Sequence, residues 1–307
     1  MSRVLITGAT GFIGRHLAPA LLARGFSVRA ALRHAEQANA LGPGIEPIVI
    51  GDIAEADWRP AIADVAAVVH LAGIAHTGEA SSEETYDRIN RWAAVDLARA
   101  AADAGIRFVF MSSVRAQSGP TALEILTEST PPAPTDAYGR AKLAAERGIA
   151  ALPGLHVILR PTLVYGRGVG GNMGALLRLA RLPIPLPFGA VRNARSLLAV
   201  ENLSEAVVFA LTNEALLRGT FLVADATPLS FADILTHLRR GAGRAPGLVP
   251  VPPSLLARGL KLVGRGEIWD RLGGDLAVST ARIEALGYRP ALTSADALAA
   301  LGAADNA

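Results

Sequence analysis

One stretch near the N-terminus, residues 4–14, constrains what this chain can fold into more than any other. It reads VLITGATGFIG: apolar residues typical of a buried strand lead into three glycines, and apolar residues at positions 13, 17, 21 and 22 then follow helical spacing. Because glycine has no Cβ, such a turn can lie against a pyrophosphate while the N-terminus of the new helix faces that anion. The spacing is G-x-x-G-x-x-G rather than the usual G-x-G-x-x-G. The stretch therefore predicts a dinucleotide-binding turn, the alternative being a strand-to-helix turn that binds nothing. Its expected cofactor contacts are Gly8, Thr10, Gly11, Phe12, Ile13 and Gly14.

The rest of the first half alternates between predicted strands and helices. Strands are expected over residues 4–6, 26–32, 46–50, 67–71, 108–111 and 157–159, with helices over 57–63 and 83–105. A further helix carries Tyr138 and Lys142, and Asp136 can cap it. Asn90 falls inside the 83–105 helix, where asparagine is disfavoured, so it is expected either to be exposed or to bond something specific. This alternation predicts an α/β fold with a Rossmann-type, doubly wound parallel sheet. Ligands of such sheets bind at the carboxyl ends of the strands, where Arg33, Asp52, Ala72, Gly73 and Ser113 are expected.

The regular alternation of predicted strands and helices ends after residue 166. Glycines cluster between 166 and 174, prolines recur between 183 and 187, and shorter helices are expected near 202–212, 230–240 and 254–263. We expect a Rossmann domain over 1–166, with returns near 196–224, and a smaller C-terminal domain over 167–307 that mainly binds substrate.

Composition narrows the class of protein. The chain has 307 residues, a net charge of +3 and no cysteine, which excludes disulfides and thiolate metal sites. Its arginines are scattered, so no nucleic-acid partner is expected. No metal site is expected either. No uncharged apolar run reaches the roughly 18 residues of a membrane span, and the first residues run directly into the first strand without a signal peptide. A cytoplasmic location is the expectation.

Arg33 bears on the choice of cofactor. It follows the second predicted strand, about 20 residues after the glycines, where an acidic side chain would bind the ribose 2′-hydroxyl of NAD. A guanidinium suits the 2′-phosphate of NADP instead, so Arg33 favours NADP, the alternative being an ordinary solvated arginine. Asp52, at the end of the third strand, can accept a hydrogen bond from an adenine amino group or cap the next helix.

Tyr138 and Lys142 form the spacing that points to catalysis. Residues four apart share one helical face, and an ammonium about 4 Å from a tyrosine hydroxyl at an effective dielectric near 20 contributes about 4 kcal/mol. That free energy is about the amount that lowers a tyrosine pKa from 10 toward 7, which suits proton transfer during hydride transfer. Ser113, 25 residues earlier at a strand end, would hydrogen-bond the substrate oxygen.

Together these segments resemble the extended short-chain dehydrogenases/reductases, and within them the nucleotide-sugar 4-epimerase and 4-keto-reductase group. The resemblance covers nearly the whole chain, through TGATGFIG, GDI, HLAG, MSSV, YGRAK, LRPTLVYG and RSLLAVENL. It implies an NAD- or NADP-dependent oxidoreductase or epimerase acting at C4 of a UDP-linked sugar. It also implies a homodimer formed by the helices near 83–105 and 136–150.

The same resemblance assigns roles to individual residues. Tyr138 is the acid/base, Lys142 lowers its pKa and holds the nicotinamide ribose, Ser113 orients the sugar oxygen, and Asn90 supports this network. The further cofactor contacts it implies are Arg33, Asp52, Ile53, Leu71, Ala72, Gly73, Tyr138, Lys142 and Pro161. Those to substrate are Ser113, Asn172, Arg195 and Arg271.

Two departures favour a reductase that consumes NADPH over an epimerase. The serine segment SSVRAQSG lacks the aromatic-glycine end of galactose epimerases, and Arg33 replaces the acidic residue expected where NAD is retained. Two other functions stay open: a dinucleotide-binding module without turnover, and a reductase of a non-nucleotide or steroid-like ketone.

Overall fold

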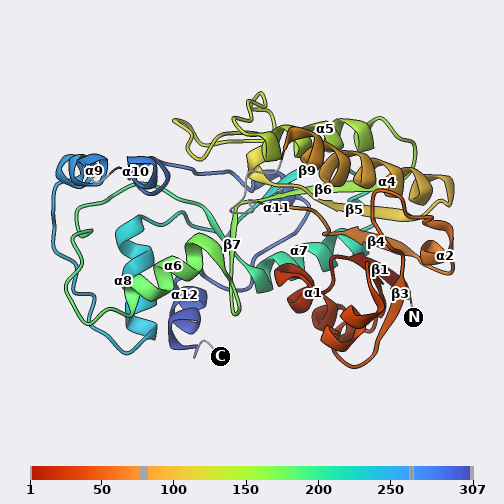
Figure 1. Ribbon diagram of the computed structural model, residues 1–307, viewed down its shortest axis with the longest axis horizontal. Helices are drawn as coiled ribbons and strands as arrows, with labels where there is room; N and C mark the ends of the chain where they lie inside the picture. The colour runs from red at the N-terminus through yellow and green to blue at the C-terminus, as the bar shows by residue number, and fades with distance from the viewer. Residues whose placement is uncertain (1, 76–81, 263, 265, 305–307) are drawn as a thin grey trace.

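A seven-stranded parallel sheet organises the molecule (Figure 1). The computed structural model describes residues 2–75, 82–262, 264 and 266–304. The strand order is β3-β2-β1-β4-β5-β6-β9, and every neighbouring pair is parallel. Order and direction confirm the predicted doubly wound α/β fold. The strands are β1 (Arg3–Thr7), β2 (Ser27–Leu32), β3 (Ile45–Val49), β4 (Ala67–His70), β5 (Arg107–Met111), β6 (His156–Pro161) and β9 (Arg218–Val223).

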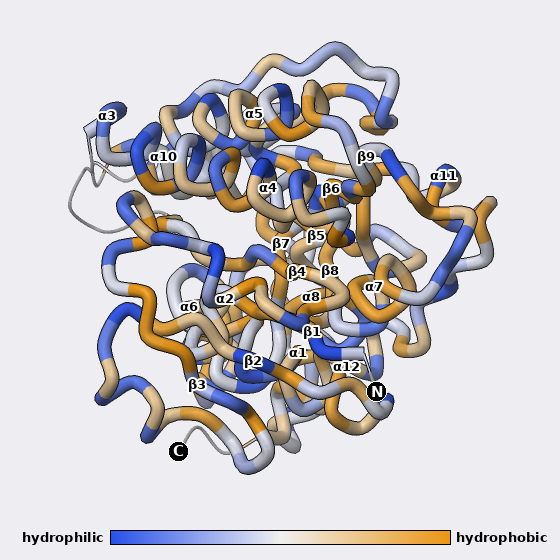
Figure 2. Tube along the Cα trace, turned by 90° about the vertical axis from the view of Figure 1, so that its right-hand side faces the viewer, coloured by the Kyte–Doolittle hydropathy of each residue, from blue (hydrophilic) through white to orange (hydrophobic). Residues whose placement is uncertain are grey.

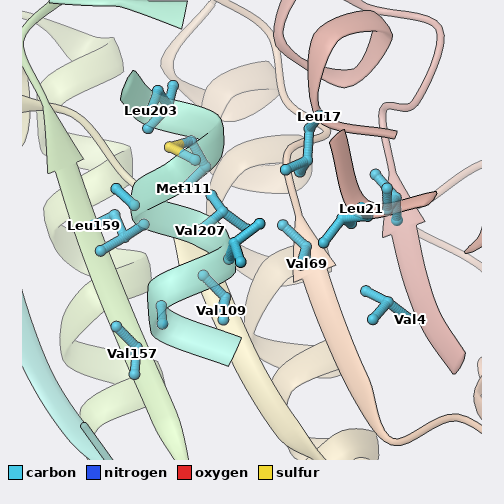
Figure 3. Packing of buried hydrophobic residues seen from close by; sticks show 14 of the residues in the cluster. Val4, Leu17, Leu21, Val69, Val109, Met111, Val157, Leu159, Leu203 and Val207 are labelled. Carbon is cyan, nitrogen blue, oxygen red and sulfur yellow. The ribbon is translucent and has the colours of Figure 1, made fainter. Parts of the chain in front are cut away.

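Alternation along the strands divides the core between the two faces of the sheet. On one face Val4 and Ile6 pack with α1 (Phe12–Ala23) and α7 (Val200–Thr212), as Figure 3 shows for Leu17, Leu21 and Val207. On the other face Leu5 and the alternate residues of β4 and β5 pack with α4 (Ala93–Asp103) and α5 (Ala137–Ala150). Figure 2 shows hydrophobic colours along the interior segments and hydrophilic colours on many outer turns.

The first half also holds shorter helical segments. These are the 3-10 helices η1 (Ala35–Ala40) and η3 (Val114–Ala116), α2 (Arg59–Ile62), α3 (Glu83–Tyr86) and the π-helix η2 (Asp87–Trp92). The helix expected over 83–105 is therefore three consecutive segments ending at Asp103, and the one expected over 57–63 is a single turn. Asp136 caps α5 as predicted, because its side chain accepts a hydrogen bond from the backbone of Gly139.

A second group of elements carries its own apolar cluster. α6 (Gly171–Ala180), α8 (Phe231–Gly241) and α12 (Ser294–Ala303) pack around Tyr165, Phe231 and Leu298, beside the parallel pair β7 (Leu163–Tyr165) and β8 (Leu197–Ala199). α9 (Pro253–Leu262) and α10 (Gly266–Gly273) lie at one end of the molecule in Figure 1.

The chain returns to the main sheet after this group begins. β9 pairs with β6 as a seventh strand, and α11 (Ala281–Ala285) packs against β9. β9 lies within the expected return near 196–224, although no strand was predicted there. Within the described residues, no helix is long and apolar enough to cross a membrane.

Candidate active site

The glycine turn has the close backbone packing that its sequence predicts. Gly8 has φ +71°, and the Gly11 N–H donates to the Gly8 carbonyl over 3.0 Å. A Cβ on Gly14 would lie 2.3 Å from the Gly8 oxygen, and one on Gly8 would lie 2.9 Å from the Ala72 nitrogen. Glycine is therefore required at both positions, since atoms of the main chain occupy the space of a side chain.

The start of α1 fits the pyrophosphate of a dinucleotide. Gly11 is its N-cap and makes no side-chain capping hydrogen bond, and the first turn contains no acidic residue. The N–H groups of such a turn and the helix dipole attract an anion. Gly8, Gly11 and Gly14 bring no side chain to this turn, so its backbone is open to a ligand. The residues present therefore fit the cofactor that the sequence implies.

A second predicted cofactor contact lies at the ends of β2 and β3. The Arg33 guanidinium is 3.8 Å from the Asp52 carboxylate and 63% exposed, and Arg88 of η2 binds the same carboxylate at 3.1 Å. The Ala54 N–H and Arg88 hold the pKa of Asp52 below its ordinary value. Asp52 is thus already hydrogen-bonded within the chain, whereas Arg33 stays open to solvent. Ile53 follows Asp52 and packs against the core.

One cavity of about 710 Å³ joins the sheet to the second group of elements. It receives residues from the carboxyl ends of β4, β5 and β6, from α5, and from α6, α8 and α10. The predicted site residues that line it are Ile13, Leu71, Gly73, Ser113, Tyr138, Lys142, Pro161, Asn172 and Arg195. Residues separated by more than 180 positions therefore meet where a doubly wound sheet binds its ligands.

Lys142 lies deep in this cavity. Its ammonium donates to the Met111 carbonyl over 2.9 Å and lies 4.7 Å from the centre of the Phe110 ring. Burial lowers the pKa of Lys142 to about 8, and the nearby Glu146 carboxylate acts in the opposite direction.

Tyr138 differs from expectation in its acidity. Burial raises the pKa of Tyr138 to about 12, although its hydrogen bond with Ser113 and the charge of Arg115 act to lower it. The expected fall toward 7 is therefore wrong for this arrangement. The physical reason is that the cost of burying a phenolate dominates over the groups that lower the pKa.

Asn90 acts on the backbone at the end of β4. It is fully buried in η2, where its amide donates to the Ile74 carbonyl (2.8 Å) and accepts from the Ile74 N–H (2.9 Å). A Cβ on Gly73 would lie 2.7 Å from the Asn90 oxygen. Asn90 thus fixes the segment that lines the cavity, which explains an asparagine inside a helical run.

The three predicted substrate residues other than Ser113 lie in different settings. Arg195 donates to the Gly274 carbonyl (2.9 Å) and the Pro120 carbonyl (3.3 Å), and burial lowers its pKa. Asn172 lies in the first turn of α6 at the cavity wall. Arg271 belongs to α10, and its side chain falls outside the described part of the structure.

Sequence reasoning missed a charged pair beside the predicted catalytic residues. Arg115, two residues after Ser113, pairs with Asp136, two residues before Tyr138, and both line the cavity. Within the described residues, the buried Arg115 Nε has no hydrogen-bond partner. Arg115 was visible in the sequence as part of the unusual segment SSVRAQSG, but its partner depends on how α5 packs against η3.

Comparison with known proteins identifies the family of this chain. The model of the NAD dependent epimerase/dehydratase family matches residues 4–224. UDP-glucose 4-epimerase of Vibrio cholerae is 36% identical over 304 residues, covering 94% of this chain and 91% of that protein.

Two of the solved structures that share the fold illustrate how much of the chain it covers. UDP-N-acetylglucosamine 4-epimerase from Bacillus cereus has a TM-score of 0.77 at 21% identity and covers 98% of both chains. UDP-glucuronic acid 4-epimerase from Bacillus cereus in complex with NAD has a TM-score of 0.76 at 20% identity, covering 98% of this chain and 97% of that one.

Fold and comparisons together define a Rossmann-type protein of the extended short-chain dehydrogenase/reductase group. The chain belongs to the NAD dependent epimerase/dehydratase family.

Proposed function

We propose that this protein catalyses NAD(P)-dependent redox chemistry at C4 of a UDP-linked sugar, as a 4-epimerase or a 4-keto-reductase. The observation that carries the proposal is the single cavity in which Ser113, Tyr138 and Lys142 meet Asn172 and Arg195. The V. cholerae relative, a UDP-glucose 4-epimerase, supports the same substrate class.

Each side chain has a defined task in this proposal. Tyr138 moves the proton of the sugar O4, Ser113 hydrogen-bonds that oxygen, and Lys142 contributes a buried positive charge beside them. Bound cofactor accepts or supplies the hydride. Tyr138 is protonated over the whole neutral range with a pKa of about 12, which suits proton donation to a keto sugar.

Asn172 and Arg195 serve the nucleotide diphosphate. The Arg195 guanidinium is held by two backbone carbonyls, so its orientation is set before substrate arrives. A positive charge placed in advance costs little conformational entropy when it meets an anion. Arg271 belongs to α10, whose Leu272 lines the same cavity, and is the second arginine of this proposal.

The direct test identifies the cofactor and the product. The purified protein is denatured and its released nucleotide analysed, and UDP-glucose and UDP-N-acetylglucosamine are then followed by NMR with added NAD or NADPH. Retained NAD with inversion at C4 identifies an epimerase. Loosely bound NADP with NADPH-dependent reduction of a UDP-4-keto sugar identifies a reductase. Absence of both reactions would refute the proposal.

Arg33 favours the reductase form with NADPH, and its substitution gives a measurable prediction. Arg33→Ser should lower the preference for NADPH over NADH roughly 10- to 100-fold, because a charge-assisted hydrogen bond contributes about 1.5–3 kcal/mol. Cofactor affinities are measured by NAD(P)H fluorescence. Arg59→Ser removes an exposed arginine that pairs with Asp57 away from the cavity and is the control. An unchanged preference in Arg33→Ser would contradict 2′-phosphate recognition by Arg33.

A reductase acting on a ketone without a nucleotide is the competing function. Arg195→Ala separates the two, because loss of a phosphate contact should weaken UDP binding at least about tenfold. Isothermal titration calorimetry with UDP measures this directly. Equal UDP affinity in the variant would remove Arg195 from the diphosphate site.

A further inference from the structure

A second charged group lies buried beneath the cavity. Glu146 and Arg160 are 4% and 5% exposed, and their side chains pair at 2.6 and 3.0 Å. The Ser112 hydroxyl donates to the same carboxylate, and Arg160 also donates to the Gln117 amide oxygen at 2.9 Å. Gln117 in turn binds the carbonyls of Thr127 and Thr130. Buried charges are costly unless they are paired in this way.

Each member of this cluster adjoins an element of the proposed active site. Ser112 precedes Ser113 at the end of β5, and Arg160 precedes Pro161 at the end of β6. Glu146 follows Lys142 by one turn of α5, so both side chains lie on the same helical face. One carboxylate therefore connects the serine segment, the lysine helix and the strand beside the cofactor site.

We propose that Glu146 is a positioning residue that keeps the Lys142 side chain charged and holds β5, β6 and α5 in register around the reacting atoms. This inference rests on the proposed function for its catalytic meaning, but the charge on Lys142 can be measured without substrate.

The surroundings of Lys142 show why a carboxylate matters there. From β5 it meets the Met111 carbonyl and the Phe110 ring. From β4 His70 stacks on the Phe110 ring, and burial and the Lys142 charge lower its pKa to about 3, so it is neutral at pH 7. Tyr138, one turn earlier on α5, is also neutral at pH 7. From η2 the neutral amide of Asn90 approaches Gly73, whose Cβ would lie 3.5 Å from the Lys142 ammonium.

The groups just described carry no formal negative charge at pH 7. Glu146 supplies one, and the positive charge of Arg160 offsets part of its effect on Lys142. Burial alone favours an uncharged lysine, whereas the carboxylate favours the ammonium. Removing Glu146 should therefore lower the pKa of Lys142 further, into the range where the enzyme would work.

The composition of the chain makes this titration accessible. The sequence contains two lysines, Lys142 and Lys261. Labelling with ¹³Cε-lysine therefore gives two side-chain signals in the full-length protein, and Lys142→Arg identifies which belongs to Lys142. Lys261 is exposed on α9 and serves as an internal reference in every spectrum.

The main variant is Glu146→Gln combined with Arg160→Gln, because the single change would leave the Arg160 charge buried without its partner. In the double variant the Lys142 titration should shift to lower pH, because Glu146 lies one helical turn from Lys142 and is the charge that raises its pKa. Ser112→Ala is the matched control: it removes a neutral donor from the same carboxylate and should leave the midpoint unchanged. Thermal melting verifies that each protein is folded.

A purely structural role for Glu146 predicts the opposite sign. Loosened packing would hydrate Lys142 and move its midpoint up toward the ordinary 10.5. An upward shift or no shift in the double variant would overturn the inference. So would an equal downward shift in Ser112→Ala.

The catalytic consequence is measured separately. The alkaline limb of the kcat pH profile should move to lower pH in the double variant, together with the lysine titration. A shifted titration with no C4 chemistry in any of the proteins would refute the proposed function and leave the charge effect of Glu146 standing. A shifted titration with an unmoved pH profile would overturn the positioning role.

Discussion

Tyr138→Phe should reduce kcat by about 100- to 10,000-fold while leaving cofactor affinity within about threefold of the parent protein. The variant keeps the ring, which packs edge-on against Tyr86 with centroids 6.2 Å apart, and removes only the hydroxyl that bonds Ser113. Stopped assays on the UDP-sugar measure kcat, and NAD(P)H fluorescence measures affinity.

Tyr86→Phe provides the matched control for this experiment. It removes a hydroxyl from a neighbouring buried tyrosine and preserves the same ring contact, so activity should stay within a few-fold. Full activity in Tyr138→Phe would exclude Tyr138 as the acid/base. The parent protein could also bind cofactor and yet turn over neither the UDP-sugars nor the UDP-4-keto sugar. That result would favour the alternative of a dinucleotide-binding module without turnover.

Local features of the sequence were the most informative about the structure. The Val4–Gly14 stretch predicted strand, turn and helix correctly, because glycine spacing and helical periodicity are properties of consecutive residues. Asp136 as the cap of α5 is confirmed for the same reason. Asn90 was expected either to be exposed or to bond something specific, and it bonds both backbone groups of Ile74.

Features that depend on distant contacts were missed. β9 has the sequence RGTFLV with a glycine inside it, and its identity as a strand comes from pairing with β6. The partners of Arg115 and Glu146 lie at 136 and 160, and spacing does not reveal them. The acidity of Tyr138 was misjudged because the energy of one ion pair was considered without the cost of burial.

Gly14→Ala is the substitution that tests the cofactor turn most severely. The added methyl would lie 2.3 Å from the Gly8 oxygen, 2.6 Å from the Ala9 Cα and 2.7 Å from the Ala9 carbonyl carbon. These are main-chain atoms, so relief requires the whole turn to move away from α1. Gly8 has little room to follow this movement, because the backbone after β1 already lies close to the backbone after β4. The measure of this closeness is that a Cβ on Gly8 would lie only 2.9 Å from the Ala72 nitrogen.

The expected result is a loss of cofactor affinity of at least about 100-fold, together with about 1–3 kcal/mol of unfolding free energy from overpacking. Gly259→Ala is the control, since it lies inside α9 with no heavy atom within 4 Å of the new Cβ. That change should stabilise the protein by up to about 1 kcal/mol, because alanine loses less backbone entropy in a helix. Fluorescence titration with NAD(P)H and urea unfolding measure both quantities. Unchanged affinity in a stably folded Gly14→Ala protein would mean that the cofactor does not lie on this turn, and the assignment of the whole cavity as a dinucleotide-dependent active site would fall with it.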